Sequence, residues 1–511
     1  MMLSLYLLLG GLAVVSTVSI PPYYANLTCE PSRTLSTWPN LTVETETGTF
    51  FLRIPYAKPP VGDLRWLPPQ KPDKSKRRYD STRYGPACPQ YVASGNSQWN
   101  MYALASLLVN LGESLNQGAV AWSSAEDCLS LAVWTPADAH RASKLPVALF
   151  VTGGGGVTGG IYIPSQLPSP WVSRSQEHIV VTINYRVNIF GNPKSRALNE
   201  TSLSLLDVRA AVEWVHENIE PFGGNPENIM LWGQSQGAGL THLYTLAFPE
   251  DSRVAKFGII SQPPSVTIDL DTVADVYRDF DIVAKALGCN YGDDAEAELE
   301  CMRQLSWVQI EEYINRYSGS PSISFSDYIP DEKYIFSNET ERYRQRKVAR
   351  GPAIRSDVAR EMSSEDVTRV MQAEGEWDCT AASDSAMRRS LGPDIYRYLW
   401  GGNFSNISPV PWLGAYHWSD LLMIFGTYQD ASGLIPQLEA DTSKSMQDHI
   451  LAFMKDSSTV QETVRWPAFD PSSADGGKIL EFGKGTPVKT VTGDWLDAGC
   501  YNSSVPFCIW G

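Results

Sequence analysis

The sequence predicts an α/β protein with a large, mostly parallel central sheet that is flanked by helices. Short apolar runs that end in glycine or polar residues alternate with segments whose apolar residues fall at helical spacing. The chain has 511 residues, of which 43% are hydrophobic and 19% are charged, so it has ample material for a large core and is too apolar to be disordered. Strands that alternate with helices pair in parallel, because each helix returns the chain to the same end of the sheet.

The elements follow one another along the chain. Residues rich in β-formers come first, and two apolar runs follow as strands. Next comes a helix that ends at Pro221 and the glycines Gly223 and Gly224, and then a short strand leads directly into a second helix. We expect a β-rich stretch over 41–53, strands over 147–151, 179–184 and 228–233, and helices over 205–219 and 237–247.

The charge excludes one class of partner. There are 57 acidic and 41 basic residues, which gives a net charge of -16. Proteins that bind nucleic acids present basic surfaces that displace counterions from phosphates. We therefore expect no nucleic-acid partner.

The first residues indicate secretion. An apolar run over 3–15 is followed by the small residues Ser16, Thr17 and Ser19, as in a secretory signal peptide. The run lacks a basic start, which leaves a signal anchor open, but it is short for a membrane span. We expect a signal peptide over 1–19, a single α/β domain over 20–511, no stable membrane anchor and an extracellular location. The sequence says nothing of the oligomeric state.

Sequons and cysteines agree with passage through an oxidising compartment. The cysteines are even in number and contain no CxxC pair, so disulfides are expected and a zinc site is not. The cysteines are Cys29, Cys88, Cys128, Cys289, Cys301, Cys379, Cys500 and Cys508. Candidate glycosylation sites are Asn26, Asn40, Asn199, Asn338, Asn403, Asn406 and Asn502.

A GxSxG motif, from Gly233 to Gly237, lies between the last predicted strand and helix. In this context the serine occupies a sharp turn that projects its hydroxyl from the carboxyl edge of the sheet. An alcohol is a weak nucleophile at neutral pH, so Ser235 needs a base, a carboxylate that orients the base, and an oxyanion hole. The spacing and context predict that Ser235 is a catalytic nucleophile.

The other catalytic parts can be sought in the sequence. A run of four glycines follows the strand over 147–151, so we expect the amides of Gly154 and Gly155, with that of Gln236, to form the oxyanion hole. A plain glycine-rich turn is the alternative. Of the six histidines, His417 is the best candidate for the base, because it lies in a loop that follows the nucleophile along the chain.

The chain resembles the type-B carboxylesterase and cholinesterase family, which has the α/β-hydrolase fold. The likeness runs from about residue 42 to residue 510 and rests on several segments besides the nucleophile. These are IPYA (54–57), PPVGDLRW (59–66), EDCL (126–129), NYR (184–186) and FGGNP (222–226). The resemblance implies hydrolysis of carboxylic esters without a cofactor or a metal, and it strengthens the assignment of His417.

The resemblance also implies the remaining partners. The family's triad acid is usually a glutamate in a segment after a proline, and Glu361 keeps the spacing of that glutamate from Pro352, although most of the segment differs. Asp357 is the alternative. Gln234 and Gln236 stand where the family commonly has glutamate and alanine. The implied disulfides are Cys88–Cys128, Cys289–Cys301 and Cys379–Cys508, which leaves Cys29 for Cys500. The implied buried ion pairs are Arg65–Glu126 and Arg186–Asp207.

Three functions remain open at this point. The first is hydrolysis of a small-molecule ester through an acyl-enzyme intermediate, and the second is lipase activity on long-chain acyl esters. The Cys88–Cys128 loop carries apolar residues at helical spacing over 101–111, so it could form a lid or pack permanently against the body. The third is a catalytically inactive binding or adhesion protein on the same fold.

Overall fold

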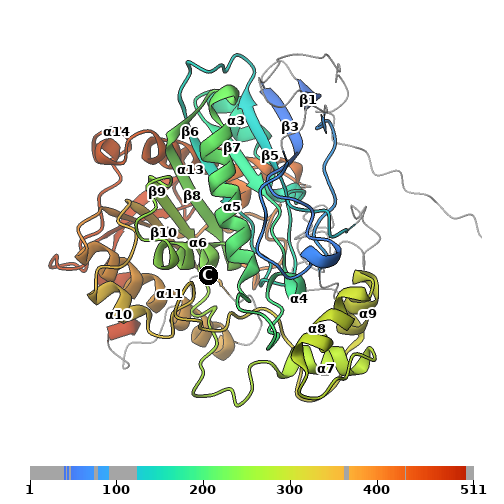
Figure 1. Cartoon of the computed structure of the whole chain (residues 1–511). Coiled ribbons are helices and arrows are strands. Elements are labelled where there is room, and N and C mark those ends of the chain that lie inside the picture. Colours follow the sequence, from blue (N-terminus) through green and yellow to red (C-terminus); the bar gives the residue numbers. More distant parts are fainter. Residues whose placement is uncertain are drawn as a thin grey trace, which may run out of the picture.

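A computed structural model describes residues 40–41, 43–44, 48–73, 79–90, 124–361, 367–431 and 433–501. Its central feature is an 11-stranded sheet (Figure 1). From one edge to the other the strands are β13 (Val488–Thr492), β12 (Lys478–Phe482), β11 (Ile395–Trp400), β10 (Ala353–Val358), β9 (Lys256–Ile260), β8 (Gly224–Gln234), β6 (Leu145–Val151), β7 (Ile179–Ile183), β5 (Ser130–Pro136), β3 (Gly48–Pro55) and β2 (Val43–Glu44). A short parallel pair, β1 (Asn40–Leu41) and β4 (Tyr79–Asp80), forms a second sheet.

The central part of the sheet is parallel. Every neighbouring pair from β7 to β12 is parallel, whereas β13 at one edge and β5, β3 and β2 at the other are antiparallel. Val151 pairs with Gly233, and Gly233 pairs with Ile259, so the carboxyl ends of β6, β8 and β9 lie side by side. The predicted fold class is confirmed as an α/β-hydrolase fold.

Helices lie over both faces of the sheet, and α5 crosses in front of the strands in Figure 1. The predicted helices over 205–219 and 237–247 correspond to α5 (Leu203–Asn218) and α6 (Gln236–Ala247). The helices α7, α8 and α9 group at a corner beyond the sheet. The other helices are α3 (Ser169–Ser175), α4 (Asn188–Gly191), α7 (Arg278–Ala286), α8 (Ala295–Gln304), α9 (Trp307–Arg316), α10 (Glu339–Arg344), α11 (Val367–Ser390), α12 (Ser419–Phe425), α13 (Gln437–Lys455), α14 (Val460–Val464), α15 (Gly493–Leu496) and α16 (Ala498–Tyr501).

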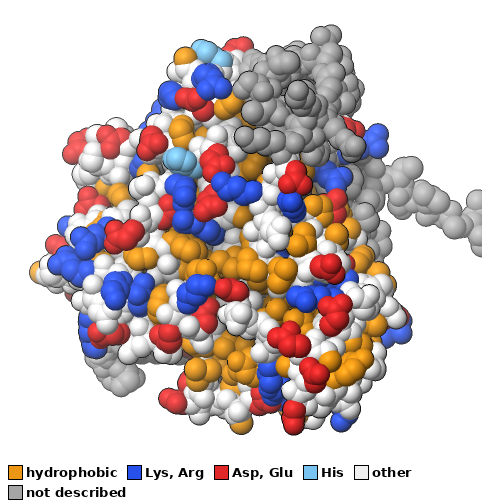
Figure 2. Space-filling view, viewed as in Figure 1, with side chains coloured by type: hydrophobic (Ala, Val, Ile, Leu, Met, Phe, Trp, Pro, Cys, Tyr) orange, Lys and Arg blue, Asp and Glu red, His pale blue; other side chains and the backbone are white. Residues whose placement is uncertain are grey.

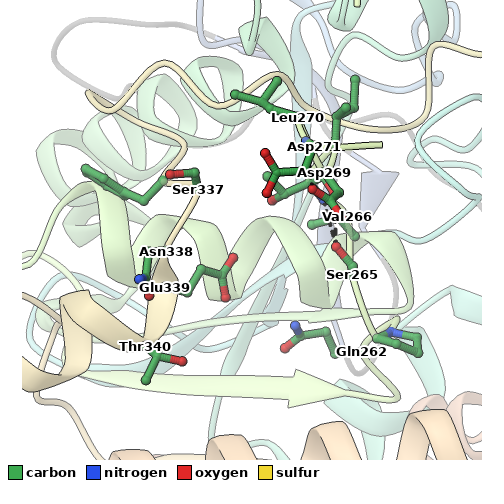
Figure 3. Close-up of a pocket in the computed structure, with 14 residues that line it drawn as sticks. Gln262, Ser265, Val266, Asp269, Leu270, Asp271, Ser337, Asn338, Glu339 and Thr340 are labelled. Carbon is green, nitrogen blue, oxygen red and sulfur yellow. Dashed lines mark hydrogen bonds between the residues drawn. The ribbon is translucent and has the colours of Figure 1, made fainter. Parts of the chain in front are cut away.

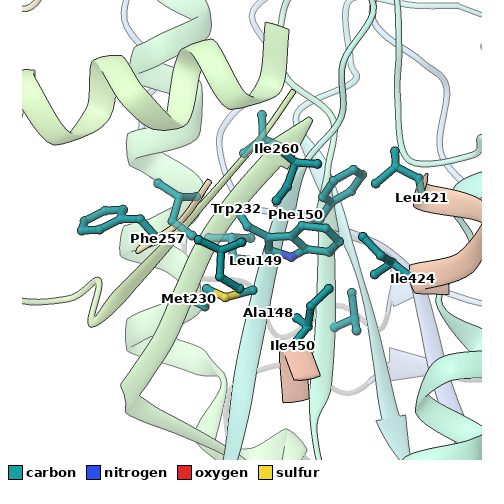
Figure 4. Close-up of a cluster of buried hydrophobic side chains, with 14 of the residues drawn as sticks. Ala148, Leu149, Phe150, Met230, Trp232, Phe257, Ile260, Leu421, Ile424 and Ile450 are labelled. Atoms are coloured by element: carbon teal, nitrogen blue, oxygen red, sulfur yellow. The ribbon is translucent and has the colours of Figure 1, made fainter. Parts of the chain in front are cut away.

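The core lies between the parallel strands and the helices that cover them. Every residue of β7 and of β9 is buried, as expected for parallel strands covered on both faces. Figure 4 shows side chains of β6, β8 and β9 meeting those of α12 and α13. The ring of Trp232 lies 4.4 Å from that of Phe150 and 5.5 Å from that of Phe425. This packing fixes the strand that carries Ser235 at its end.

Both ion pairs implied by the resemblance are present; the Arg186–Asp207 pair is fully buried and the Arg65–Glu126 pair is partly buried. Arg65 Nε lies 2.6 Å from Glu126 Oε1, and Arg186 Nη2 lies 2.7 Å from Asp207 Oδ1. Paired burial of this kind fixes architecture more than it adds net stability.

The disulfides correct one expectation. Cys88 bonds Cys128 and Cys289 bonds Cys301, as implied, but Cys379 bonds Cys500 and not Cys508. The reason is the placement of α16, which carries Cys500. Just before that helix, Asp497 forms a buried ion pair with Arg397 of β11, which holds α16 against α11. The pairing of Cys29 with Cys500 is therefore also wrong.

Some expectations fall outside the described residues. These are the signal peptide, the helix over 101–111 within the Cys88–Cys128 loop, Cys29, Cys508, Asn26 and Asn502. In the described part of the chain, no helix has both the length and the apolar character needed to cross a membrane. Figure 2 shows acidic and basic side chains intermixed over one face of the molecule, with an apolar band across its middle.

Candidate active site

Ser235 forms the turn between β8 and α6. Its backbone angles, φ 55° and ψ -127°, are strained for a residue with a side chain. The Ser235 amide donates a hydrogen bond to the carbonyl oxygen of Ile260, at 3.0 Å, and so extends the pairing of β8 with β9. The sheet itself therefore holds the strained residue in place.

Glycine is required on both sides of Ser235 because the backbone approaches too closely for a side chain. A Cβ on Gly233 would lie 2.3 Å from the carbonyl oxygen of Gly237, and one on Gly237 would lie 2.0 Å from that of Val151. Backbone atoms cannot move aside as the end of a flexible side chain can. The GxSxG spacing thus follows from the contact of the turn with α6 and β6.

The glycine-rich run lies against the same turn. A Cβ on Gly153 would lie 2.9 Å from Ser235 Cβ. Gly154 and Gly155 have φ values of 122° and 62°, which favour glycine. The amides of Gly154, Gly155 and Gln236 donate no hydrogen bond to any described residue. The backbone that was predicted to supply an oxyanion hole is therefore beside Ser235, with these donors available in the described structure.

His417 and Glu361 come from separate loops and meet in the interior. His417 Nδ1 lies 2.5 Å from Glu361 Oε2. Glu361 follows the end of β10, where its Oε1 accepts a hydrogen bond from the Val358 amide at 3.4 Å. His417 precedes α12, and its amide donates to the carbonyl oxygen of Arg360 at 3.2 Å. The exposed fractions of His417 and Glu361 are only 7% and 5%.

Burial governs the protonation of this pair. Loss of hydration raises the pKa of the Glu361 carboxyl well above its usual range, and Asp357 and Asp420 act in the same direction. Burial lowers the pKa of the His417 imidazole to about 4, against the opposing effect of Asp420. His417 is thus neutral at physiological pH. We assign its proton to Nδ1 from the bond to Glu361, which leaves Nε2 as an acceptor.

Gln234 connects His417 to the Ser235 turn. Its side-chain nitrogen lies 3.1 Å from His417 Nε2, and the residue is only 2% exposed. Trp377 of α11 also contacts the imidazole edge-on, with ring centroids 5.0 Å apart. Sequence reasoning noted Gln234 only as a departure from the family and missed Trp377. The sequence feature that could have indicated the contact of Gln234 with His417 is its position directly before Ser235.

Other acidic residues and histidines near the site bond different partners. Asp357, the alternative acid, pairs with Arg397 at 2.9 Å. His242 bonds Glu339 at 2.8 Å. Asp420 accepts a hydrogen bond from the Tyr398 hydroxyl at 2.8 Å, and burial raises its pKa to about 6. Of the two candidate acids, Glu361 is the one that contacts His417.

Comparison with known proteins identifies the family. The model of the carboxylesterase family matches residues 40–364, which include Ser235 and Glu361. A chlorogenic acid esterase of Aspergillus niger is 35% identical over 464 residues, which cover 84% of this chain and 87% of that protein. Secreted lipase 5 of Gibberella zeae is 33% identical over 482 residues, or 86% of this chain and 87% of that protein. An acetylcholinesterase of Bungarus fasciatus is 29% identical over 55% of this chain and 45% of that protein. The chain therefore belongs to the carboxylesterase family and is a carboxylic ester hydrolase.

Proposed function

We propose that the protein is a secreted serine hydrolase that cleaves carboxylic esters through an acyl-enzyme intermediate. Ser235 is the nucleophile, His417 the general base and Glu361 the acid that orients it. One observation carries the proposal: His417 bonds Glu361 at 2.5 Å through Nδ1, and its Nε2 lies beside the residue that precedes Ser235. The amides of Gly154, Gly155 and Gln236 form the oxyanion hole.

Acylation begins when Ser235 Oγ attacks the ester carbonyl carbon. His417 Nε2 takes the hydroxyl proton as the new C–O bond forms, and Glu361 stabilises the resulting imidazolium. The carbonyl oxygen becomes an oxyanion that accepts hydrogen bonds from the backbone amides. The tetrahedral intermediate then expels the alcohol, which takes the proton from Nε2.

Deacylation repeats these steps with water. His417 Nε2 accepts a proton from water as the water oxygen attacks the acyl carbon, and the proton then returns to Ser235 Oγ when the acid leaves. A base with a pKa depressed to about 4 is neutral between turnovers at neutral pH. That state is the one each half-reaction requires.

Secretion is part of the proposal. It is supported by the signal-like residues 1–19, by three disulfides in the described structure and by the match to a protein named as a secreted lipase. The test is expression with the natural N-terminus and N-terminal sequencing of the medium fraction. We expect a mature chain that begins at Ile20.

Two relatives suggest different substrate classes. One is named for chlorogenic acid, and the other is named a lipase. A lipase function is the second candidate, because the relative that is 33% identical over 86% of this chain is named a secreted lipase. Rates on chlorogenic acid, on nitrophenyl esters of increasing chain length and on emulsified triacylglycerol separate the two. A sharp rise in rate above the solubility limit of the long-chain ester would favour the lipase.

An inactive binding protein is the alternative from another class. The altered segment around Glu361 favours it, whereas the contact of Glu361 with His417 and the strained Ser235 turn oppose it. Labelling by a fluorophosphonate distinguishes the two, because only an activated serine reacts.

Replacement of the nucleophile tests the mechanism directly. Ser235→Ala should lower kcat on a nitrophenyl ester by about 10⁶-fold and leave the fold intact by circular dichroism. Ser252→Ala, at an exposed turn, is the matched control and should retain full activity. Full activity of the Ser235→Ala variant would overturn the proposal.

A further inference from the structure

A cavity of about 550 Å³ lies between the loop that follows β9 and the start of α10 (Figure 3). This volume is in the range of sites that hold small organic ligands, roughly 300–1,000 Å³. None of Ser235, His417 and Glu361 lines it. The cavity is therefore not the catalytic site described above.

The walls of the cavity suit an uncharged, hydroxyl-rich occupant. The carboxylates of Asp269, Asp271 and Glu339 line it, and no basic side chain of the described part of the chain does. Carboxylates accept hydrogen bonds from hydroxyl groups and disfavour anions. Among the described residues, no group of His, Cys, Asp and Glu could hold a metal ion. Leu270 also lines the cavity and is 49% exposed, so an apolar wall there lacks a protein cover.

One wall of this cavity is a glycosylation sequon. Asn338, Glu339 and Thr340 all line it, and Asn338 and Thr340 are exposed. Asn338 Oδ1 caps α10 by accepting a hydrogen bond from the Glu341 amide at 3.0 Å. Asn338 Nδ2, the atom to which a glycan is joined, has no hydrogen-bond partner among the described residues. Figure 3 shows Leu270 and Asp269 across the space from Asn338.

The sequon at Asn406 is built differently. Asn406 is only 2% exposed, and its Nδ2 donates to Glu439 Oε1 at 3.0 Å. Ser408, the hydroxyl residue of that sequon, is 5% exposed. A glycan there is incompatible with the folded chain, whereas Asn403 is exposed and does not line the cavity. These two sites provide natural comparisons for Asn338.

We propose that an N-linked glycan on Asn338 folds back onto the protein and fills this cavity with its first sugars. The transfer joins C1 of the oligosaccharide to Asn338 Nδ2, which loses a proton, and releases the lipid pyrophosphate that carried the sugar. The sugar hydroxyls donate to Asp269, Asp271 and Glu339, and the apolar face of a ring covers Leu270. The inference rests on the secretory route proposed above.

The first experiment maps occupancy and protection. The full chain is secreted from a yeast host, and glycopeptides are identified by mass spectrometry. We expect occupancy at Asn338 and none at Asn406. An endoglycosidase that cleaves between the first two sugars should act on the native protein much more slowly at Asn338 than at Asn403, and equally on both after denaturation. An unoccupied Asn338 beside an occupied Asn403 or Asn199 would overturn the proposal.

The second experiment measures what the glycan contributes. Asn338→Asp removes the glycan but keeps the helix cap, because a carboxylate also accepts from the Glu341 amide. We expect Tm to fall by about 2 °C and hydrogen exchange to rise in residues 264–271. Ser405→Ala, which removes the Asn403 sequon, is the control and should change neither.

Two further results would overturn the proposal. The first is an Asn338 glycan that is cleaved as fast as the Asn403 glycan, with no effect of Asn338→Asp. The second is a secreted chain without glycan at any sequon, which would show that Asn338 is not modified even on the secretory route. Ester hydrolysis by the same preparations tests the catalytic proposal separately, because none of these residues belongs to the proposed triad or oxyanion hole.

Discussion

The turn after β8 and the loop after β10 bring catalytic residues to the same edge of the sheet, but different forces fix them. Around Ser235 the constraint is steric, since backbone atoms of β6 and α6 leave no space for a Cβ on Gly233 or Gly237. Around Glu361 the constraint is electrostatic, since the carboxyl is buried near Asp357 and Asp420 and bonds His417. A steric constraint appears in the sequence as glycines at fixed spacing. An electrostatic one depends on residues far apart in the chain.

The largest effect is expected when a methyl group is added to the tightly packed turn around Ser235. In Gly237→Ala the new methyl group would lie 2.0 Å from the carbonyl oxygen of Val151. We expect the free energy of unfolding to fall by about 3 kcal/mol and ester hydrolysis to be lost. Urea denaturation and a nitrophenyl ester assay measure the two effects.

Gly239→Ala is the matched control on the same helix. Its methyl group would lie 2.8 Å from Val266 Cγ1, which belongs to a side chain and can shift. We expect a smaller loss of stability and retained activity. Equal losses of stability and activity in Gly237→Ala and Gly239→Ala would show that contact with backbone atoms is not what makes Gly237 necessary.

The region around Glu361 should be sensitive to substitutions that remove a charge but keep the shape of the side chain. Glu361→Gln should lower kcat by about 10⁴-fold, because an amide cannot stabilise the imidazolium or hold the same tautomer. Asp357→Asn should retain activity but lose about 1–3 kcal/mol of stability, since Asp357 bonds Arg397 rather than His417. Steady-state kinetics and urea denaturation on both variants test the contrast. The reverse pattern would make Asp357 the acid.

The pH profile should report the burial of His417. The base works only when it is deprotonated, and burial lowers its pKa to about 4. Activity should therefore persist as the pH falls below 6.5, the usual histidine value, and be lost near pH 4. The measurement is kcat/KM from pH 3.5 to 8, with circular dichroism at each pH to detect acid unfolding. An acidic limb near pH 6.5 would contradict the effect of burial.

The smallest effect is expected at Gln234, where the Ser235 turn contacts His417. Gln234→Glu places a carboxylate beside His417 Nε2, which favours the charged imidazole and should raise its pKa by about 1–3 units. The acidic limb of kcat/KM should move to higher pH, with activity near pH 8 retained. Gln234→Met removes the amide without adding charge and should leave the limb in place. A shift of the limb in Gln234→Met would assign the effect to the lost hydrogen bond.

The sequence predicted the steric region nearly completely. Apolar runs predicted β6 and β7 to within two residues of their observed limits, whereas β8 begins four residues before the expected start. The GxSxG motif placed Ser235 between β8 and α6 because the motif and its context are adjacent in the chain. The glycine run after β6 was located on the same grounds. Each of these features depends on residues within a few positions of one another.

Prediction was weaker where distant segments meet. Glu361 was preferred to Asp357 only through the resemblance, because the deciding contact comes from His417, and Asp357 is engaged by Arg397 on β11. The disulfide of Cys379 was assigned to the wrong partner for the same reason, since the Arg397–Asp497 pair determines where Cys500 lies. No local sequence pattern indicates such contacts.

The hydrogen bond from the Ser235 amide to the Ile260 carbonyl oxygen makes the backbone of the nucleophile as rigid as the sheet. An amide bonded across two buried parallel strands exchanges with solvent only when those strands separate. Ser235 is therefore an internal reporter, and its rate of deuterium uptake measures how often the central sheet opens. Heat or denaturant that opens β8 from β9 would release the strained turn at the same moment, so that activity and sheet integrity would be lost together.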